Sequence, residues 1–155
     1  MTRVGSDGDT IGDLMAAFYS TISGGDGEQD WARGANLFHP DAHMVRTRIE
    51  QGQPRAWVFN HDAYVTSTRA ILAGRSFYEM ETARETVQFG QIAQVFSTYE
   101  AREAPDSDVL LFRGVNMVHL WHDGTRWWIM SVIWDNEREG VTLPARWIAD
   151  QDGAC

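Results

Sequence analysis

The stretch from Arg113 to Asn136 constrains the fold of this chain more than any other part of its sequence. Two runs rich in β-branched and aromatic residues meet at Asp123-Gly124, and an Asp-Gly pair between such runs is the strongest short-range signal for a β-hairpin. A two-residue turn there sets Asn116 opposite Ser131. Strand side chains alternate between faces, so these two polar residues would share one face. The other face would carry Arg113, Val115, Met117, His119, Trp128, Met130, Val132 and Trp134.

Further strands are predicted upstream of this hairpin. A turn at Phe89-Gly90 joins two of them, and a polar turn at residues 104–108 leads on to the hairpin. The predicted strands cover residues 77–87 and 91–103, and the next begins at residue 109. One register sets Glu100 opposite Arg113 and an aromatic ring opposite Gly114, and both are favourable cross-strand pairs.

This register decides which side chains share the Asn116 face. Tyr99 and Ser97 would join it from the neighbouring strand, and Trp127 from the hairpin itself. The next strand would send Met80, Thr82 and Arg84 to the Asn116 face, and Glu79, Glu81 and Glu85 to the opposite face. Most carboxylates would then point outward, and Arg84 would be the one buried cation.

The first half of the chain is predicted to be mainly helical. Apolar residues at helical spacing predict a helix from Ile11 to Ile22, capped by Asp9 or Thr10. We then expect a helix over residues 31–37, a strand over 43–49, a loop over 50–55, and a third helix capped by Asn60. Helices followed by antiparallel strands predict an α+β fold, and the absence of repeats or linkers indicates one domain over residues 1–155.

Composition and charge disfavour several classes of partner. The formal net charge of −9 and the pI near 4.9 disfavour nucleic acid and anionic membrane surfaces, because both bind basic faces. No apolar run approaches the roughly 18 residues that a membrane span needs. The one cysteine, Cys155, allows no intrachain disulfide, so we expect a reducing cytoplasmic setting.

Three residues form an H-x-D-x-H triplet that could bind a metal ion: His39, Asp41 and His43. Their spacing matches no strong metal signature, and Pro40 is expected to leave His39 outside the following strand. We therefore predict no metal and no cofactor.

The order of these features resembles the nuclear transport factor 2-like superfamily, also called SnoaL-like or cystatin-like α+β barrels. The resemblance rests on a helical hairpin, the FHPDA corner at residues 38–42, a third helix, and a strand meander ending in GTRWWIMSVIWDNE. It spans about residues 11–144. The strings EMETAR, QIAQVFSTYEAR and RGVNMV, in this order, resemble a subgroup of small bacterial proteins, mostly without assigned function.

The resemblance implies a cone-shaped barrel in which three N-terminal helices pack on a curved, mostly antiparallel sheet. The concave face, closed by the helices, would hold a small-molecule pocket. Two chains would form a homodimer through the convex face. An apolar patch there would be unfavourable on a monomer, and it would include Met117, Trp128, Met130 and Trp134, with His119 and Trp121 at its rim.

The ketosteroid isomerases of this superfamily allow a test of the chemistry. The tyrosine on their first helix falls at Phe18, their general-base aspartate near Arg46, and their aspartic acid on the fourth strand at Asn116. The base and the phenol are therefore missing. Chemistry of that kind would need Tyr19 or Asp41 to substitute from a shifted position.

The candidate ligand-binding residues come mainly from the pairing of the strands. Asn116 and Ser131 would orient a ligand carbonyl or hydroxyl, or else satisfy each other and a structural water. Arg84 would hold a ligand carboxylate, or else form a structural salt bridge with Asp41 or Asp135. The set is completed by Tyr19, Ser97, Tyr99 and Trp127.

His39 and Asp41 are the candidate catalytic residues. A histidine beside an acid can shuttle protons near neutral pH, and the FHPDA corner is expected above the mouth of the pocket. The alternative is that Asp41 caps local backbone amides and His39 is half exposed.

The predicted function is therefore a pocket for a small hydrophobic or carbonyl ligand, in a SnoaL-like, cofactor-independent cyclase, isomerase or dehydratase. The alternative is a non-catalytic ligand-binding or interaction module, including an accessory subunit of a ring-hydroxylating dioxygenase. The two classes differ in whether a titratable group lies within hydrogen-bonding reach of the ligand.

Overall fold

The computed structural model describes residues 6–148, so Cys155 lies outside the described part of the chain. No helix within these residues is both long enough and apolar enough to cross a bilayer. In chain order the elements are α1 (Ile11–Ile22), α2 (Trp31–Ala35), β1 (Phe38–Glu50), β2 (Gln53–Phe59), α3 (His61–Leu72), β3 (Tyr78–Phe89), β4 (Ile92–Arg102), β5 (Phe112–His122), β6 (Trp127–Asn136) and the 3-10 helix η1 (Ala145–Trp147).

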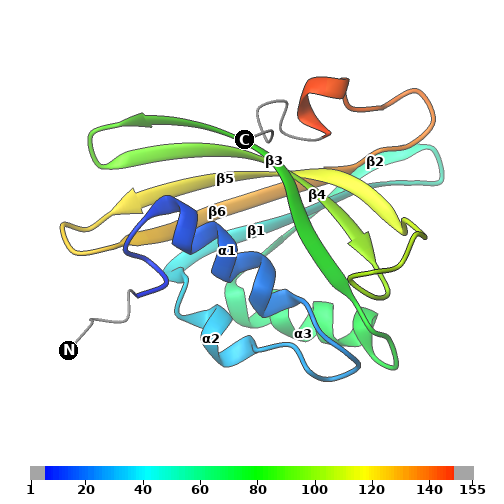
Figure 1. Cartoon of the computed structure of the whole chain (residues 1–155), viewed down its shortest axis with the longest axis horizontal. Coiled ribbons are helices and arrows are strands. Elements are labelled where there is room, and N and C mark those ends of the chain that lie inside the picture. Colours follow the sequence, from blue (N-terminus) through cyan, green and yellow to red (C-terminus); the bar gives the residue numbers. More distant parts are fainter. Residues whose placement is uncertain (1–5, 149–155) are drawn as a thin grey trace.

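The strands form one sheet in the order β2-β1-β6-β5-β4-β3. β1 and β6 run parallel, and the other neighbouring pairs are antiparallel. Figure 1 shows α1, α2 and α3 on one side of the sheet and η1 on the other. We call the helix side the inner face and the opposite side the outer face. The α+β prediction is confirmed, but β1 and β2 separate α2 from α3, so the helices form no single N-terminal block.

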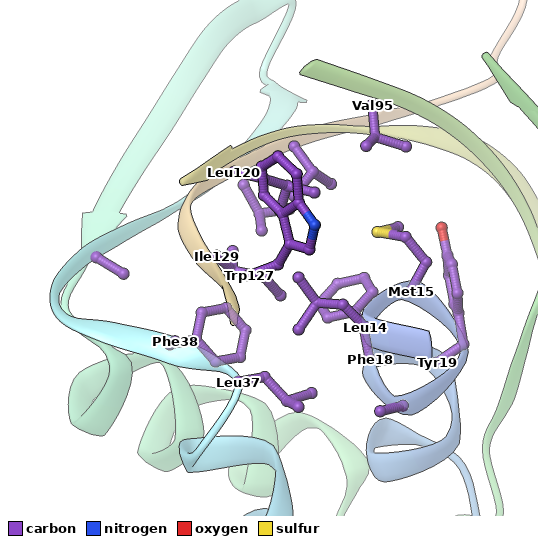
Figure 2. Packing of buried hydrophobic residues seen from close by; sticks show 14 of the residues in the cluster. Leu14, Met15, Phe18, Tyr19, Leu37, Phe38, Val95, Leu120, Trp127 and Ile129 are labelled. Carbon is purple, nitrogen blue, oxygen red and sulfur yellow. The ribbon is translucent and has the colours of Figure 1, made fainter. Parts of the chain in front are cut away.

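The helices begin where their caps predict. Thr10 accepts a hydrogen bond from the first turn of α1, and Asn60 does the same for α3. The apolar stripe of α1 packs on the inner face, where Leu14 and Met15 are fully buried. Figure 2 shows this stripe meeting side chains from β1, β4, β5 and β6. Burial stabilises the fold by about 1.5–3 kcal/mol for each side chain of this size.

Residues 50–55, predicted as a loop, contain a tight turn and the start of β2. Gln51 and Gly52 have φ angles of 50° and 72°, the left-handed conformation of a type I′ hairpin turn. Pro54 is tolerated because β2 lies at the edge of the sheet. β1 also begins at Phe38 rather than His43, so the FHPDA corner is part of a strand.

The β5–β6 hairpin turns at the predicted place with a wider turn. His122, rather than Leu120, lies opposite Trp127. The Asp123 carboxylate closes the turn by accepting hydrogen bonds from the backbone of Thr125 and Arg126. This turn moves the register by two residues, which leaves the faces of the first part of β6 unchanged.

A bulge at Met130 then adds one residue to β6. One extra residue moves every later side chain to the other face of the sheet. Ser131 therefore lies opposite His119 on the outer face, and its predicted pairing with Asn116 is wrong. Trp134, predicted on the outer face, lies opposite Asn116 on the inner face.

A second bulge, at Thr82, decides the faces of β3. The predicted pairing of β4 with β5 is confirmed, including the pairs Glu100–Arg113 and Tyr99–Gly114. On β3, the bulge lets Glu81 lie opposite Tyr99 and Arg84 opposite Ser97. Glu79 and Glu81, predicted on the outer face, therefore lie on the inner face, because the strand does not alternate regularly through the bulge.

Candidate functional site

A cavity of about 460 Å³ lies between the inner face of the sheet and helices α1 and α3. Apolar atoms form the larger part of its lining surface, although apolar and polar side chains are about equal in number. Its polar side chains include Arg46, Tyr64, Glu79, Tyr99, Asn116 and Asn136. A largely apolar wall with a few convergent polar groups is typical of a small-molecule site.

Glu79 is the buried acid of this cavity, with an exposed fraction of 9%. Burial raises the pKa of its carboxyl to about 7, and a hydrogen bond from Asn116 Nδ2 at 3.4 Å opposes part of that rise. Glu79 takes part in none of the ion pairs among residues 6–148. The Ser23 hydroxyl accepts the Glu79 backbone N–H at 3.0 Å, which ties this end of β3 to the end of α1. A carboxyl with this pKa can take or give a proton at neutral pH.

A directed chain of hydrogen bonds runs from Asn116 to the β3 edge of the sheet. The Ser97 hydroxyl donates to Oε2 of Glu81 at 2.5 Å, because a carboxylate only accepts. Its one proton is then used, so the Tyr19 hydroxyl donates to Ser97 across 2.6 Å. Tyr19 accepts in turn from Asn116 Nδ2 at 3.1 Å. Arg84 holds the far end by donating twice to Oε1 of Glu81.

The direction of this chain decides which end of the Asn116 amide a ligand meets. Nδ2 faces Tyr19 and Glu79, and the amide oxygen makes no hydrogen bond to any described residue. Asn116 lines the cavity, so it offers a ligand an acceptor rather than a donor.

Three tyrosines near Glu79 remain neutral phenols. Burial raises the pKa of Tyr19, Tyr64 and Tyr99, and the charge of Glu79 raises each one further. The Tyr99 hydroxyl donates to Oδ1 of Asn136 at 2.5 Å. The acid/base capacity of the cavity near pH 7 therefore lies with Glu79.

Arg46 is a cation of the same cavity. Its Nη1 donates to the Ser67 hydroxyl at 2.7 Å and its Nη2 to the Thr68 hydroxyl at 3.2 Å. Its guanidinium carbon lies 5.3 Å from the centre of the Phe59 ring and 5.7 Å from that of Trp134. Burial lowers its pKa, but an arginine stays charged near neutral pH.

Solved structures with this architecture cover most of the chain. A variant of Rv3472 from Mycobacterium tuberculosis, a protein of unknown function, is 18% identical over 88% of this chain and 76% of its own, with a TM-score of 0.62. An NTF2-like protein of unknown function from Pseudomonas putida KT2440 is 10% identical over 86% and 90%, with a TM-score of 0.64. The chain has the nuclear transport factor 2-like fold.

Another protein with a similar structure, from Novosphingobium aromaticivorans, is provisionally assigned as a scytalone dehydratase. It is 13% identical over 83% of this chain and 82% of its own, with a TM-score of 0.61. At these identities the likeness shows the fold alone. No protein-family model and no curated protein matches the sequence.

In this nuclear transport factor 2-like fold, the sequence-predicted site residues fall into separate groups. Tyr99 and Asn116 line the cavity. Tyr19 and Ser97 are buried beside it in the hydrogen-bond chain. Trp127 is buried in the α1 core and does not line the cavity.

Arg84 lies on the inner face, as predicted, but it is not a buried cation. It is at the β3 edge of the sheet, with 31% of its side chain exposed, and it is paired with Glu81. Its predicted salt bridge to Asp41 or Asp135 is therefore replaced by a local one.

The predicted catalytic pair lies away from the cavity. His39 packs on the outer face, with ring centres 5.9 Å from Trp121 and 6.3 Å from Trp128. The Asp41 side chain is 91% exposed, and its backbone N–H donates to His39 Nδ1. Ser131 is also on the outer face. Because β1 already includes Phe38, His39 and Asp41 belong to a strand instead of a corner above the pocket, and the pairing of this strand with β6 is irregular between Phe38 and His43. No three His, Cys, Asp or Glu side chains within residues 6–148 are arranged to hold a metal ion.

Two residues of the cavity were not assigned a role from the sequence. Regular alternation along β3 predicts Glu79 on the outer face of the sheet, because the bulge that turns it inward carries no clear sequence signal. Arg46 was noted only as the position near which the resemblance places the isomerase base. Phe18, Arg46 and Asn116, the positions singled out by that resemblance, all line the cavity.

Proposed function

We propose that the protein is a cofactor-independent acid/base enzyme, an isomerase, dehydratase or cyclase, for a small and largely apolar carbonyl compound. The observation that carries this proposal is Glu79, a buried carboxyl with a pKa near 7 in the wall of a ligand-sized cavity. The likeness to a protein provisionally assigned as a scytalone dehydratase is in keeping with this class.

In the proposed reaction, ionised Glu79 takes a proton from the carbon next to the ligand carbonyl. The electron pair of the broken C–H bond forms an enolate. Protonated Glu79 then returns the proton, either to another carbon, which gives isomerisation, or to a departing hydroxyl, which gives dehydration with release of water. The Asn116 oxygen would orient a ligand hydroxyl or N–H during these steps.

Glu79 takes the role first assigned to His39 and Asp41. The alternative of a non-catalytic ligand-binding module loses its main support, because a titratable group now lies in the cavity wall. The accessory-subunit reading has no observation that favours it.

Hydrogen–deuterium exchange tests the proton transfer without knowledge of the final product. The full chain is incubated in D₂O near neutral pH with 2-tetralone, and deuterium uptake beside the carbonyl is followed by NMR. We expect catalysed exchange that falls by about 10²–10⁴-fold in Glu79→Gln, the range for a general base. Glu85→Gln is the matched control, since Glu85 is exposed on the same strand. Equal exchange with wild type and Glu79→Gln would favour the non-catalytic module.

We also propose a homodimer through the outer face. Exposed apolar side chains gather there: Val87, Phe89, Ile92, Met117, Trp121 and Ile133. Sedimentation at micromolar concentration should give a dimer, and Trp121→Glu should give a monomer, because a charge would be buried in the interface. A monomeric wild type would contradict this proposal.

A further inference from the structure

We propose that the ligand of the cavity is an apolar acid, whose carboxylate is held by Arg46 while its hydrocarbon or aromatic part fills the remaining space. This ligand class rests on the proposed function, because the acid would occupy the same cavity that Glu79 lines. It is carried by the surroundings of Arg46 rather than by those of Glu79.

Arg46 has no acidic partner, in contrast to half of the twelve arginines among residues 6–148. Six others lie within 4.0 Å of a carboxylate: Arg33, Arg48, Arg84, Arg102, Arg113 and Arg138. Among residues 6–148 no carboxylate lies that close to Arg46. Burial lowers the pKa of its guanidinium and the like charge of Arg48 lowers it further, whereas Tyr64 raises it. A partly buried charge without a counter-ion is unfavourable, and a ligand anion would relieve it.

The contacts of Arg46 orient its guanidinium without neutralising it. Ser67 and Thr68 offer neutral hydroxyl oxygens, one to each terminal nitrogen. The rings of Phe59 and Trp134 flank the group. A guanidinium held in this way is preorganised for a planar, two-oxygen anion, since its N–H groups match the geometry of a carboxylate.

The other charges of the cavity are compatible with an anion. Arg48 and Arg75 also line it, against Glu79 and Glu103. Glu79 is mainly neutral below pH 7, because burial raises its pKa to about 7. Arg46 lies on β1 and Glu79 on β3, and β6, β5 and β4 separate these two strands in the sheet. A ligand can then place its carboxylate at Arg46 and its reacting carbon at Glu79.

The test compares two probes of nearly the same shape, 2-naphthoate and the neutral 2-naphthamide. Their binding to the full chain is measured by calorimetry at about pH 6, where the acid is ionised and Glu79 is mostly protonated. We expect wild type to prefer the acid by about tenfold or more, the usual scale of a charge-assisted bidentate contact. Arg46→Met, which keeps the approximate length of the side chain, should remove this preference by weakening binding of the acid much more than binding of the amide.

Two further variants complete the design. Arg55→Met is the matched control, because Arg55 is exposed on β2 and does not line the cavity; it should behave as wild type. Arg46→Lys keeps the charge and should retain a weaker preference for the acid, which guards against an unfolded Arg46→Met protein.

Equal binding of both probes by wild type, an unchanged preference in Arg46→Met, or no binding of the acid would each overturn the inference. Glu79→Gln separates this inference from the proposed function. It should keep the preference for the acid while losing proton exchange. Loss of exchange with no acid preference would retain the enzyme and reject the apolar acid.

Discussion

Glu79 and Glu81 lie two residues apart on β3 and point from the same face of the sheet, yet their surroundings differ in almost every respect. Glu79 is buried in the cavity wall without a cation, and burial raises its pKa to about 7. Glu81 lies at the sheet edge, where Arg84 and Ser97 donate to its two oxygens. The same residue type on the same strand therefore has acid/base capacity only where burial disfavours its ionised form, as at Glu79.

The two carboxylates are also the two ends of one hydrogen-bonded network. Asn116 donates to Glu79 at one end, and the chain through Tyr19 and Ser97 ends on Glu81. Glu81 is thus a positioning residue: it sets the direction of the chain and so the orientation of the Asn116 amide. Changes at the two ends should therefore have different consequences.

The largest difference is expected in proton exchange. Glu79→Gln should reduce catalysed exchange of 2-tetralone by about 10²–10⁴-fold, whereas Glu81→Gln should reduce it by less than about tenfold, because Glu79 lines the cavity and Glu81 does not. Parallel NMR time courses in D₂O measure both. Equal losses of exchange in the two variants would mean that proton transfer depends on both carboxylates.

The next effect is on stability as a function of pH. The pKa of Glu79 is about 7 in the folded protein against an ordinary value of 4.5, so the folded state binds the proton more tightly. This contribution is fully present below about pH 4.5 and is lost as the pH rises through 7, by roughly 3 kcal/mol. Urea unfolding at a series of pH values should show this loss in wild type and in Glu85→Gln. In Glu79→Gln the loss of unfolding free energy that comes from the Glu79 carboxyl should be absent. A wild-type dependence on pH in that variant would contradict the raised pKa of Glu79.

A smaller effect is expected from the middle of the chain. Ser97→Ala removes the acceptor of the buried Tyr19 hydroxyl, which should lower the free energy of unfolding by about 1–3 kcal/mol. A double-mutant cycle with Tyr19→Phe provides the control, because a second substitution should add little once the hydrogen bond is gone. Strictly additive effects would argue against a direct bond between the two hydroxyls.

The smallest effect is expected at the sheet edge. Arg84→Met should lower the free energy of unfolding by less than about 1 kcal/mol, because 31% of the Arg84 side chain and 18% of the Glu81 side chain are exposed to solvent. The effect should shrink further in high salt, which screens exposed pairs. A loss as large as that of Ser97→Ala would show that the ion pair holds the whole network.

The local features of the sequence predicted much of the fold. The caps Thr10 and Asn60, the turn at Asp123-Gly124 and the pairing of Tyr99 with Gly114 are all found in the structure. Each depends on residues close in sequence or on one cross-strand pair. The candidate site was predicted less well: Tyr99 and Asn116 line the cavity, whereas His39 and Asp41 lie outside it.

The errors in the faces of β3 and β6 have one physical origin. Strand side chains alternate with a period of two, so a single extra residue moves all later side chains to the opposite face. The bulge at Met130 moved Ser131 outward, and the bulge at Thr82 left Glu79 and Glu81 inward. A bulge forms because the sheet must bend around its core, and neighbouring residues alone do not specify that requirement.

The sequence by itself determined most of the element types, the acidic charge and the α+β class, because these follow from local periodicity, capping and composition. The tertiary structure decided that Glu79 faces the cavity, that Glu81 is paired with Arg84, and that Arg46 has no carboxylate within reach among the described residues. Those outcomes depend on distances between β1, β3, β4 and the helices, and such distances are set only when the sheet closes over its core.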